Sequence, residues 1–551
     1  MKHFSTHFLS LAVSLLVSVA TSQAQSNGIQ QVWATPYTNS KSGDNNDVAK
    51  DVAVDAAGNV YVTGYSLGSD NLYDFITTKY SASGQQLWEA RYNEPGSNFD
   101  KATSVVVDAA GNVYVTGTSH TDYVTIKYST SGQQLWMARY NGPGNGTDEP
   151  IDLVLDGAGN VYVTGTSVGA GSGSDYATLK YDGVSGQQLW VTRYNGAGRS
   201  EDQASALVLD ATGNVYVSGS SYGRSDYVTL KYSPSGQQLW EARYNGISNG
   251  GGSAADVAVD ATGNVYVTGY SFGSSTGYDY ATVKYSATGE QQWASRYNGT
   301  NSRNDWATNL ALDATGNVFV TGRSYSGASL STSDYATLKY SATGQQLWEA
   351  RYNGSGNGAD VATDLTVDAA GNAYVTGYSD SSTGDESYDY ATLKYAATSG
   401  QQLWTVRYNG DSNGVDQANS IVVDAAGNVY VTGYSVSSGT NSDYITLKYA
   451  QTGSSPLSAA SAQQNLEELA VYPNPAATQA TVSFRALANG SAQVQVYNQL
   501  GQQVATLYEG TVSRGQRYTL PLNSQNLASG LYTCSLLVNG QRESVRLHVA
   551  H

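Results

Sequence analysis

Cysteine, histidine and basic residues are scarce in this chain of 551 residues. Cys534 is the only cysteine, so no internal disulfide can form and the fold must be held together by packing. There are 28 Lys and Arg residues against 45 Asp and Glu residues, which argues against a nucleic-acid partner because binding phosphates requires a positive surface. After residue 24 no segment is apolar for long enough to span a bilayer, which takes about 20 residues.

Glycine and tyrosine are abundant, with 60 and 44 residues, whereas charged residues make up only 13% of the chain. Together with an apolar content of 40%, this composition is typical of an extracellular β-rich protein. A single hydrophobic core stops growing at about 250–300 residues, so a chain of this length is divided into domains or extends by repetition.

The first 24 residues have the features of a secretory signal peptide. Lys2 and His3 precede an apolar stretch from Phe8 to Ala20, and residues 22–24 form a small-x-small cleavage pattern. The alternative, a membrane anchor, needs a longer apolar run. No cysteine lies near the cleavage point, so there is no lipid-attachment site. We predict that residues 1–24 direct export.

One sequence unit is repeated eight times within residues 25–449. Each copy carries G-N-V-Y-V-T-G or a near variant, then a segment of the type D-Y-x-T-x-K-Y, then Q-L-W-x-x-R-Y-N. The first motif begins at Gly58, Gly111, Gly159, Gly213, Gly263, Gly316, Gly371 and Gly427. The first unit predicts four short strands, near residues 51–55, 60–64, 75–80 and 86–92, because these segments are rich in strand formers and bounded by turn residues. Eight such units predict an all-β fold with an eight-bladed β-propeller, and an unclosed superhelix is the alternative.

The phase of the repeats predicts how the ring closes. The chain starts with a fourth-strand sequence, Gln31-Val32-Trp33, and the last unit ends at Tyr449 after its third strand. We therefore expect the N-terminal strand to complete the last blade.

The repeats over residues 31–449 resemble the bacterial SBBP β-propeller repeat family. Their segment S-G-Q-Q-L-W also resembles the docking segment of quinone-dependent dehydrogenases and the sialidase Asp-box. The adjacent cysteine pair of many of the dehydrogenases is absent, however, and the Asp of the Asp-box is missing. We interpret both likenesses as convergence on a turn followed by an aromatic strand.

The C-terminal part has a different composition. Residues 450–464 are small and polar, which is typical of a flexible linker. The segments VYPNP at 471–475, VYNQLGQQV at 496–504 and LASGLYTCSLLVNGQRESVRLHV at 527–549 resemble the type A C-terminal sorting domain of type IX secretion. The resemblance covers nearly all of residues 465–551 and places the sorting motif at Tyr472, Pro473, Asn474, Pro475, Gly501, Gly530 and Tyr532.

This resemblance implies a small Ig-like β-sandwich that engages the outer-membrane secretion machinery of a Gram-negative bacterium. It also implies a protein that is secreted or held on the outer cell surface, with later cleavage or anchoring of the sorting domain. The alternative is a β-sandwich with no role in export.

The loops of the repeats differ between the two faces of a propeller. The turns between strands 1 and 2 and between strands 3 and 4 are nearly invariant, whereas the other connections vary in length and content. Because variable loops on a rigid scaffold usually carry binding residues, we expect the site on the variable face. Residues that depart from the repeat are the binding candidates, namely Lys101, Glu149, Arg303, Trp306, Arg323, Asp385 and Glu386. Solvated loop residues without a ligand are the alternative.

Metal chemistry has few candidate ligands. His120 is the only histidine of the repeats and no cysteine occurs there, which excludes His or Cys metal clusters and a Cys–His nucleophile. Calcium remains a candidate because it prefers hard oxygen ligands. Asp148 with Asp152 and Asp385 with Asp389 offer such oxygens, although neither pair has EF-hand spacing.

These patterns predict an exported, non-enzymatic binding or adhesion module for glycan or protein, with no catalytic residue assigned and no cofactor apart from the calcium candidate. Two alternatives stay open. One is a secreted polysaccharide-active enzyme that uses carboxylates on the variable face. The other is a structural component of the cell surface.

Overall fold

A computed structural model describes residues 28–37, 46–68, 70–94, 96, 99–196, 201–222, 226–247, 250–273, 275–300, 302–326, 332–380, 387–410, 414–436, 442–451, 466–472, 474, 476–486, 489–498, 503–514, 516–528, 530–538 and 541–550. The chain divides into two compact units, Met1–Ser454 and Ser455–His551. The predicted signal peptide and residues 452–464 of the predicted linker lie outside the described residues.

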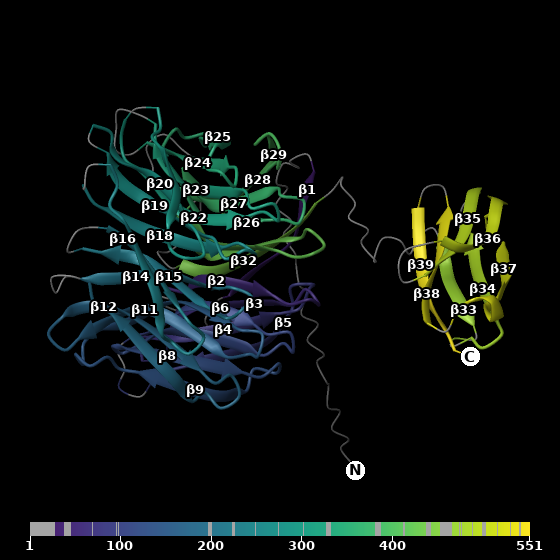
Figure 1. Cartoon of the computed structure of the whole chain (residues 1–551), viewed down its shortest axis with the longest axis horizontal. Helices are drawn as coiled ribbons and strands as arrows, with labels where there is room; N and C mark the ends of the chain where they lie inside the picture. The colour runs from purple at the N-terminus through teal and green to yellow at the C-terminus, as the bar shows by residue number, and fades with distance from the viewer. Residues whose placement is uncertain are drawn as a thin grey trace, which may run out of the picture. The chain divides into compact units, whose positions relative to one another are not determined.

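In its described part, the first unit consists of eight four-stranded antiparallel sheets that follow one another along the chain (Figure 1). Their first strands are β2 (Val48–Val54), β6 (Asp100–Val107), β10 (Asp148–Leu155), β14 (Asp202–Leu209), β18 (Gly252–Val259), β22 (Asp305–Leu312), β26 (Asp360–Val367) and β30 (Asp416–Val423). The second strands are β3 (Val60–Leu67), β7 (Val113–Ser119), β11 (Val161–Gly169), β15 (Val215–Ser221), β19 (Val265–Gly273), β23 (Val318–Tyr325), β27 (Ala373–Asp380) and β31 (Val429–Val436). The third strands are β4 (Tyr73–Tyr80), β8 (Asp122–Tyr128), β12 (Gly173–Tyr181), β16 (Asp226–Tyr232), β20 (Gly277–Tyr285), β24 (Ser333–Tyr340), β28 (Tyr388–Tyr395) and β32 (Ser442–Gln451). The fourth strands are β5 (Gln86–Tyr92), β9 (Gln134–Tyr140), β13 (Gln188–Tyr194), β17 (Gln238–Tyr244), β21 (Gln291–Tyr297), β25 (Gln346–Tyr352), β29 (Gln402–Tyr408) and β1 (Ile29–Tyr37).

The last sheet takes its fourth strand from the N-terminal end of the chain. Strand β1 pairs antiparallel with β32, and Trp33 lies opposite Lys448. Strand β32 runs to Gln451, which pairs with Ile29, so it extends two residues into the segment that the sequence predicts as linker. The backbone of β1 provides pairing partners for Ala450 and Gln451, which the composition of the segment did not indicate.

The first strands form a ring, and we call the space around its axis the channel. Each of them contacts the first strand of the sheet before and of the sheet after, and β30 contacts β2. Two hydrogen bonds join these end strands, from Asn419 Nδ2 to the Ala49 carbonyl at 2.6 Å and from Ser420 Oγ to Asp51 Oδ1 at 3.0 Å. The first and last sheets are therefore neighbours.

Neighbouring sheets pack face to face through apolar side chains. Tyr61 and Phe75 of one sheet share a buried cluster with Val113 of the next. The fourth-strand tryptophan lies on a turn of the following sheet, where the ring of Trp88 covers Gly132. A Cβ atom at Gly132, whose φ is +82°, would lie 2.8 Å from that ring, so only glycine fits this contact.

Asp55 caps the invariant turn between the first and second strands of its sheet. Asp55 Oδ1 accepts hydrogen bonds from the backbone N–H groups of Ala57 at 2.9 Å and Asn59 at 2.8 Å. Gly58 has a φ of +77°, which a glycine adopts without strain. These hydrogen bonds hold the pKa of Asp55 below its usual range, against the effect of its partial burial.

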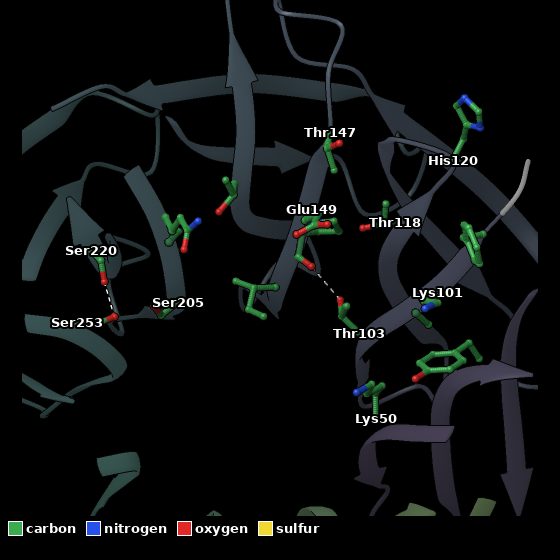
Figure 2. A pocket seen from close by; sticks show the side chains of 18 residues that line it. Lys50, Lys101, Thr103, Thr118, His120, Thr147, Glu149, Ser205, Ser220 and Ser253 are labelled. Carbon is green, nitrogen blue, oxygen red and sulfur yellow. Dashed lines mark hydrogen bonds between the residues drawn. The ribbon is translucent and has the colours of Figure 1, made fainter. Parts of the chain in front are cut away.

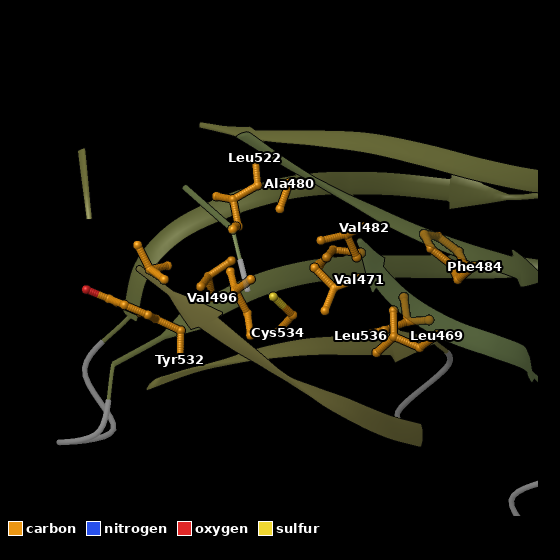
Figure 3. Packing of buried hydrophobic residues seen from close by; sticks show 14 of the residues in the cluster. Leu469, Val471, Ala480, Val482, Phe484, Val496, Leu522, Tyr532, Cys534 and Leu536 are labelled. Carbon is orange, nitrogen blue, oxygen red and sulfur yellow. The ribbon is translucent and has the colours of Figure 1, made fainter. Parts of the chain in front are cut away.

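The second unit contains two sheets around one core. One sheet has the order β33 (Leu466–Tyr472), β34 (Gln479–Ala486) and β37 (Arg517–Asn523). The other has the order β36 (Gln503–Val512), β35 (Gly490–Tyr497), β38 (Gly530–Val538) and β39 (Gln541–Val549). A single 3-10 turn, η2 (Ser524–Asn526), is present among the described residues. Val482 and Phe484 of the first sheet pack with Val496, Cys534 and Leu536 of the second (Figure 3).

Candidate functional site

Two cavities open at the end of the channel where the first strands begin. The polar cavity has a volume of about 610 Å³ and lies against the first five sheets (Figure 2). The aromatic cavity has a volume of about 600 Å³ and lies against the fifth to seventh sheets. The polar cavity is lined by Lys50, Tyr65, Phe99, Lys101, Ala102, Thr103, Thr118, His120, Thr147, Glu149, Pro150, Ile151, Thr166, Gln203, Ala204, Ser205, Ser220 and Ser253. The aromatic cavity is lined by Ala255, Tyr270, Tyr278, Trp306, Ala307, Thr308, Arg323 and Val361.

The structure brings two of the predicted binding residues together in the aromatic cavity. Trp306 on β22 lies directly opposite Arg323 on β23, because the two strands are paired in register there. The guanidinium carbon of Arg323 lies 4.0 Å from the centre of the indole ring. Stacking holds both side chains in one orientation at the cavity wall.

Three tyrosines extend this pair into a row of aromatic rings. The ring centres of Trp306 and Tyr325 are 5.5 Å apart, and those of Trp306 and Tyr270 are 6.2 Å apart. Tyr278 continues the row at 5.1 Å from Tyr270. Sequence reasoning missed these tyrosines because most tyrosines belong to the repeat. For Tyr270 one signal was available. It follows the motif G-N-V-Y-V-T-G, and the residue at this position varies between units, being Tyr in some and Arg, Thr or Ser in others.

Lys101 and Glu149 are both in the polar cavity, on the first strands of adjacent sheets. Lys101 Nζ lies 4.8 Å from the ring centre of Tyr65 and 4.7 Å from that of Tyr73. Glu149 is exposed and is the only carboxylate among the described residues that line this cavity. The two predicted residues therefore share one cavity, together with Lys50 on β2, which sequence reasoning did not select.

The other predicted binding residues are placed elsewhere. Arg303 lies in the connection before β22, where its backbone borders Gly277, and it is not among the residues that line either cavity. Arg303 is only three residues before Trp306 in the sequence, but β22 begins at Asp305. Arg303 therefore belongs to the connection, whereas Trp306 belongs to the strand. Asp385 and Glu386 lie outside the described residues.

The aspartates that precede these variable positions are buried and fasten the neighbouring loops. Asp148 accepts hydrogen bonds from the backbone N–H groups of Gly142 at 2.6 Å and Val168 at 3.0 Å. Asp305 and Asp360 hold the N–H groups of their own loops in the same way. Burial raises the pKa of both Asp305 and Asp360 to about 6. These carboxylates position the loops that border the cavities.

Deeper in the channel, the first, third, fifth and seventh sheets each contribute one aspartate. Each side chain follows a β-bulge in its first strand, and the four are Asp51, Asp152, Asp256 and Asp364. Each accepts a hydrogen bond from a backbone N–H of the next sheet, as Asp152 does from Leu207 at 3.0 Å. Desolvation within the channel raises the pKa of Asp152 and Asp364 to about 7 and that of Asp256 to about 6. We call these four residues the channel aspartates.

The calcium candidates are engaged by protein groups. The carboxylates of Asp148 and Asp152 bind different backbone N–H groups, and Asp389 forms an ion pair with Arg407 at 2.9 Å. Asp385, the remaining candidate, is outside the described part of the chain. Among the described residues there is no group of three or more His, Cys, Asp or Glu side chains that could hold a metal ion.

In the second unit, the expected sorting motif spans both sheets. Asn474 Nδ2 donates to the Arg546 carbonyl at 2.8 Å, and the His548 N–H donates to Asn474 Oδ1 at 2.8 Å. Tyr532 donates a hydrogen bond to the Ala528 carbonyl at 2.9 Å, Gly530 begins β38, and Tyr472 is half exposed at the end of β33. Pro473, Pro475 and Gly501 lie outside the described residues.

Repeated four-stranded sheets around a channel define the first unit as a β-propeller, and comparison with protein families identifies its repeats and the second unit. Residues 470–549 match the secretion system C-terminal sorting domain. Residues 42–73 and 404–439 match the beta-propeller repeat of the SBBP family. Residues 74–277 match the family model described as outer membrane protein assembly factor BamB. The chain thus carries SBBP β-propeller repeats and a C-terminal sorting domain of type IX secretion, which indicates a secreted or cell-surface protein.

A comparison with curated protein sequences finds no match. Solved structures similar to the chain include the polysaccharide lyase Uly1, at 9% identity and a TM-score of 0.41, with 73% of this chain and 89% of that chain covered. The WD40 domain of SCAP from fission yeast is similar at 8% identity and a TM-score of 0.40, covering 76% and 98%. A fungal alcohol oxidase of the AA5 family is similar at 13% identity and a TM-score of 0.40, covering 92% and 100%. In the described residues, no helix is long and apolar enough to cross a membrane.

Proposed function

We propose that this protein is an exported binding module whose channel mouth binds an extracellular glycan without turning it over. Its eight four-stranded sheets are the blades of a closed eight-bladed propeller, completed by the N-terminal strand. The pairing of β1 with β32 and the hydrogen bonds between the first and last sheets support closure. A closed ring holds the channel mouth as one rigid surface.

The observation that carries this proposal is the addition of Trp306 to a pair of tyrosine rings, Tyr270 and Tyr278, a pair that also occurs in the first and seventh sheets. Trp306, Tyr270 and Tyr278 line one cavity, and Arg323 is fixed on the indole beside them. Aromatic faces cover the apolar face of a sugar ring, and cation groups and hydroxyls bind its oxygens. Because the other repeats lack this tryptophan, the row is not required by blade geometry.

Binding is favoured over glycoside hydrolysis by the composition of the polar cavity. Hydrolysis by a carboxylate pair requires an acid and a second carboxylate on opposite sides of the scissile bond. Glu149 has no second carboxylate among the described residues that line the cavity. Its neighbours are hydroxyl and ammonium groups, which bind oxygen atoms.

The second unit, in this proposal, is an Ig-like β-sandwich that delivers the propeller to the outer-membrane secretion machinery. Residues 1–24 are a signal peptide, and the segment between β32 and residue 465 is a linker. Within residues 465–551, the hydrogen bonds of Asn474 tie the sorting motif to β39. These contacts support an ordered recognition surface at that end of the unit.

A glycan array probed with the full mature chain tests the proposed function. We expect saturable binding without product release, and Trp306→Ala should weaken it by about 2 kcal/mol, roughly thirtyfold in Kd, because a central aromatic contact is removed. Val184→Ser is the matched control, since Val184 is 85% exposed in a turn remote from both cavities. Product release would favour a polysaccharide-active enzyme. Binding to proteins but to no glycan would favour a module for adhesion to proteins. Absence of any ligand would favour a structural surface component.

A further inference from the structure

The described lysines of the first unit fall into two groups. Those at the repeated third-strand position each have a hydrogen-bond or ion-pair partner, as Lys127 does with the Gly183 carbonyl at 2.7 Å and Lys448 with the Ala82 carbonyl at 3.0 Å. The others of this group are Lys79, Lys180, Lys231, Lys284, Lys339 and Lys394. Lys50 and Lys101 form neither kind of contact with a described residue and lie only against aromatic rings.

These two ammonium groups face the same part of the polar cavity (Figure 2). They share the ring of Tyr65, whose centre lies 5.7 Å from Lys50 Nζ and 4.8 Å from Lys101 Nζ. The rings of Tyr73 and Phe99 complete the surroundings of Lys101. An aromatic face attracts a cation but does not neutralise it.

The cavity therefore holds positive charge without a bound carboxylate. Desolvation by the channel wall lowers the pKa of Lys50, and the charge of Lys101 lowers it further. Desolvation also lowers the pKa of Lys101. An anion bound between them would remove this repulsion and restore the charge-assisted hydrogen bonds that each ammonium lacks.

The other polar groups of the cavity suit a saccharide that carries this anion. Thr118 and Thr166 supply hydroxyl groups on the wall, and the hydroxyl oxygens of Thr103 and Ser205, which donate to the Pro150 and Ala254 carbonyls, can accept hydrogen bonds. Glu149 faces the cavity from the next sheet, so the two ammonium groups leave one net positive charge, apart from His120 at the rim. In a chain of net charge −17, this positive cavity is a local exception that selects for a negative ligand.

Arg323 extends the same property to the aromatic cavity. Its guanidinium stacks on Trp306 and makes no hydrogen bond or ion pair with a described residue. We propose that the channel mouth recognises an acidic polysaccharide, with a carboxylate or sulfate group bound between Lys50 and Lys101 and another sugar of the same polymer stacked at Trp306 across the ring. This inference rests on the proposed function, since it names the class of glycan.

Binding of the full chain to three polymers tests the inference: polygalacturonate, dextran sulfate and neutral dextran. We expect both or one of the anionic polymers to bind and neutral dextran to bind at least roughly tenfold more weakly, since two charge-assisted contacts are lost. Binding should weaken from about 50 mM to about 500 mM NaCl because salt screens the charges of the two lysines and of the polymer. Tighter binding of polygalacturonate identifies a carboxylate as the bound anion, and tighter binding of dextran sulfate identifies a sulfate.

The decisive variant is the double substitution Lys50→Gln and Lys101→Gln, with the double substitution Arg514→Gln and Arg517→Gln at exposed positions of the second unit as the charge-matched control. The double variant should lose at least roughly tenfold in affinity for the anionic polymer, and the control should lose none. Thermal unfolding checks that each variant is folded, and Lys50→Gln alone serves if Lys101→Gln is unstable, because Lys50 is exposed.

The outcomes separate this inference from the proposed function. Equal binding of neutral and anionic polymers, or full affinity in the folded lysine variants, overturns the inference while glycan binding stands. If no saccharide on the array or in solution binds the chain, both are overturned.

Discussion

At the scale of single residues, the glycine–tryptophan contact between neighbouring sheets is the most demanding feature. The ring of Trp33 covers Gly84, and the ring of Trp88 covers Gly132, each at 2.8 Å from the position of a Cβ atom. Both glycines have a positive φ. One residue type thus meets two requirements, a left-handed backbone and close approach of an aromatic ring.

Gly132→Ala should destabilise the propeller by about 1–2 kcal/mol for its backbone conformation and about 1–3 kcal/mol more for the displaced tryptophan. Gly171→Ala is the matched control, because Gly171 has a φ of +85° but no neighbour within 4 Å of a Cβ atom. Urea unfolding of both variants measures the difference. Equal losses would show that the tryptophan contact adds nothing.

At the scale of secondary-structure elements, the β-bulge of the first strands decides which side chains face the channel. The pairing of β10 with β11 shifts register between Pro150 and Asp152, and the other first strands shift at the equivalent place. The bulge directs the next side chain toward the channel axis, where Asp152 and Asp364 bond to the following sheet. The four carboxylates thereby join the sheets in consecutive pairs, the first to the second, the third to the fourth, the fifth to the sixth and the seventh to the eighth.

Because of the channel aspartates, we expect the free energy of unfolding to fall as the pH rises from about 5 to about 8. Their folded pKa values, about 7 for Asp152 and Asp364, exceed the unfolded value of about 3.9, so the folded state binds more protons in this range. Thermal unfolding at several pH values should give a smaller slope for Asp152→Asn than for the unchanged chain. Asp182→Asn, in an exposed turn, is the control and should keep the full slope. A flat profile between pH 5 and 8 in the unchanged chain would contradict this prediction.

At the scale of the whole molecule, the N-terminal strand contacts both the last sheet and the first. Strand β1 pairs with β32, while Trp33 Nε1 donates to the Ala82 carbonyl at 3.2 Å and Tyr37 donates to Glu89 Oε1 at 3.1 Å. Strand β32 would be an unpaired edge without β1. Stability of the first unit therefore depends on residues that are separated by almost its whole length.

A chain that starts after Tyr37 should unfold at a temperature at least about 5 °C lower, because backbone pairing and two side-chain contacts are lost. It should also self-associate through the exposed edge of β32. Size-exclusion chromatography and calorimetry measure both effects. Removal of residues 455–551 is the control, since these form a separate compact unit and the melting of the propeller should not change.

The sequence alone predicts the repeats, the strand order and the pairing of the first and last strands of the first unit. Counting the units and finding where the first and last are incomplete is enough to predict all three. Turn capping by Asp55 and packing of Trp88 follow from the same periodicity. The sorting domain was recognisable from its motifs.

Only the tertiary structure decided which variable residues meet. Lys101, Glu149, Trp306 and Arg323 line the two cavities, and their role in binding stays a prediction; the grouping of Lys50 with Lys101 depends on the contact between the first two sheets. The channel aspartates were hidden because a β-bulge changes the alternation of side chains without changing the sequence pattern. A linear repeat specifies the blade, whereas the register and curvature of the packed blades determine which side chains share a site.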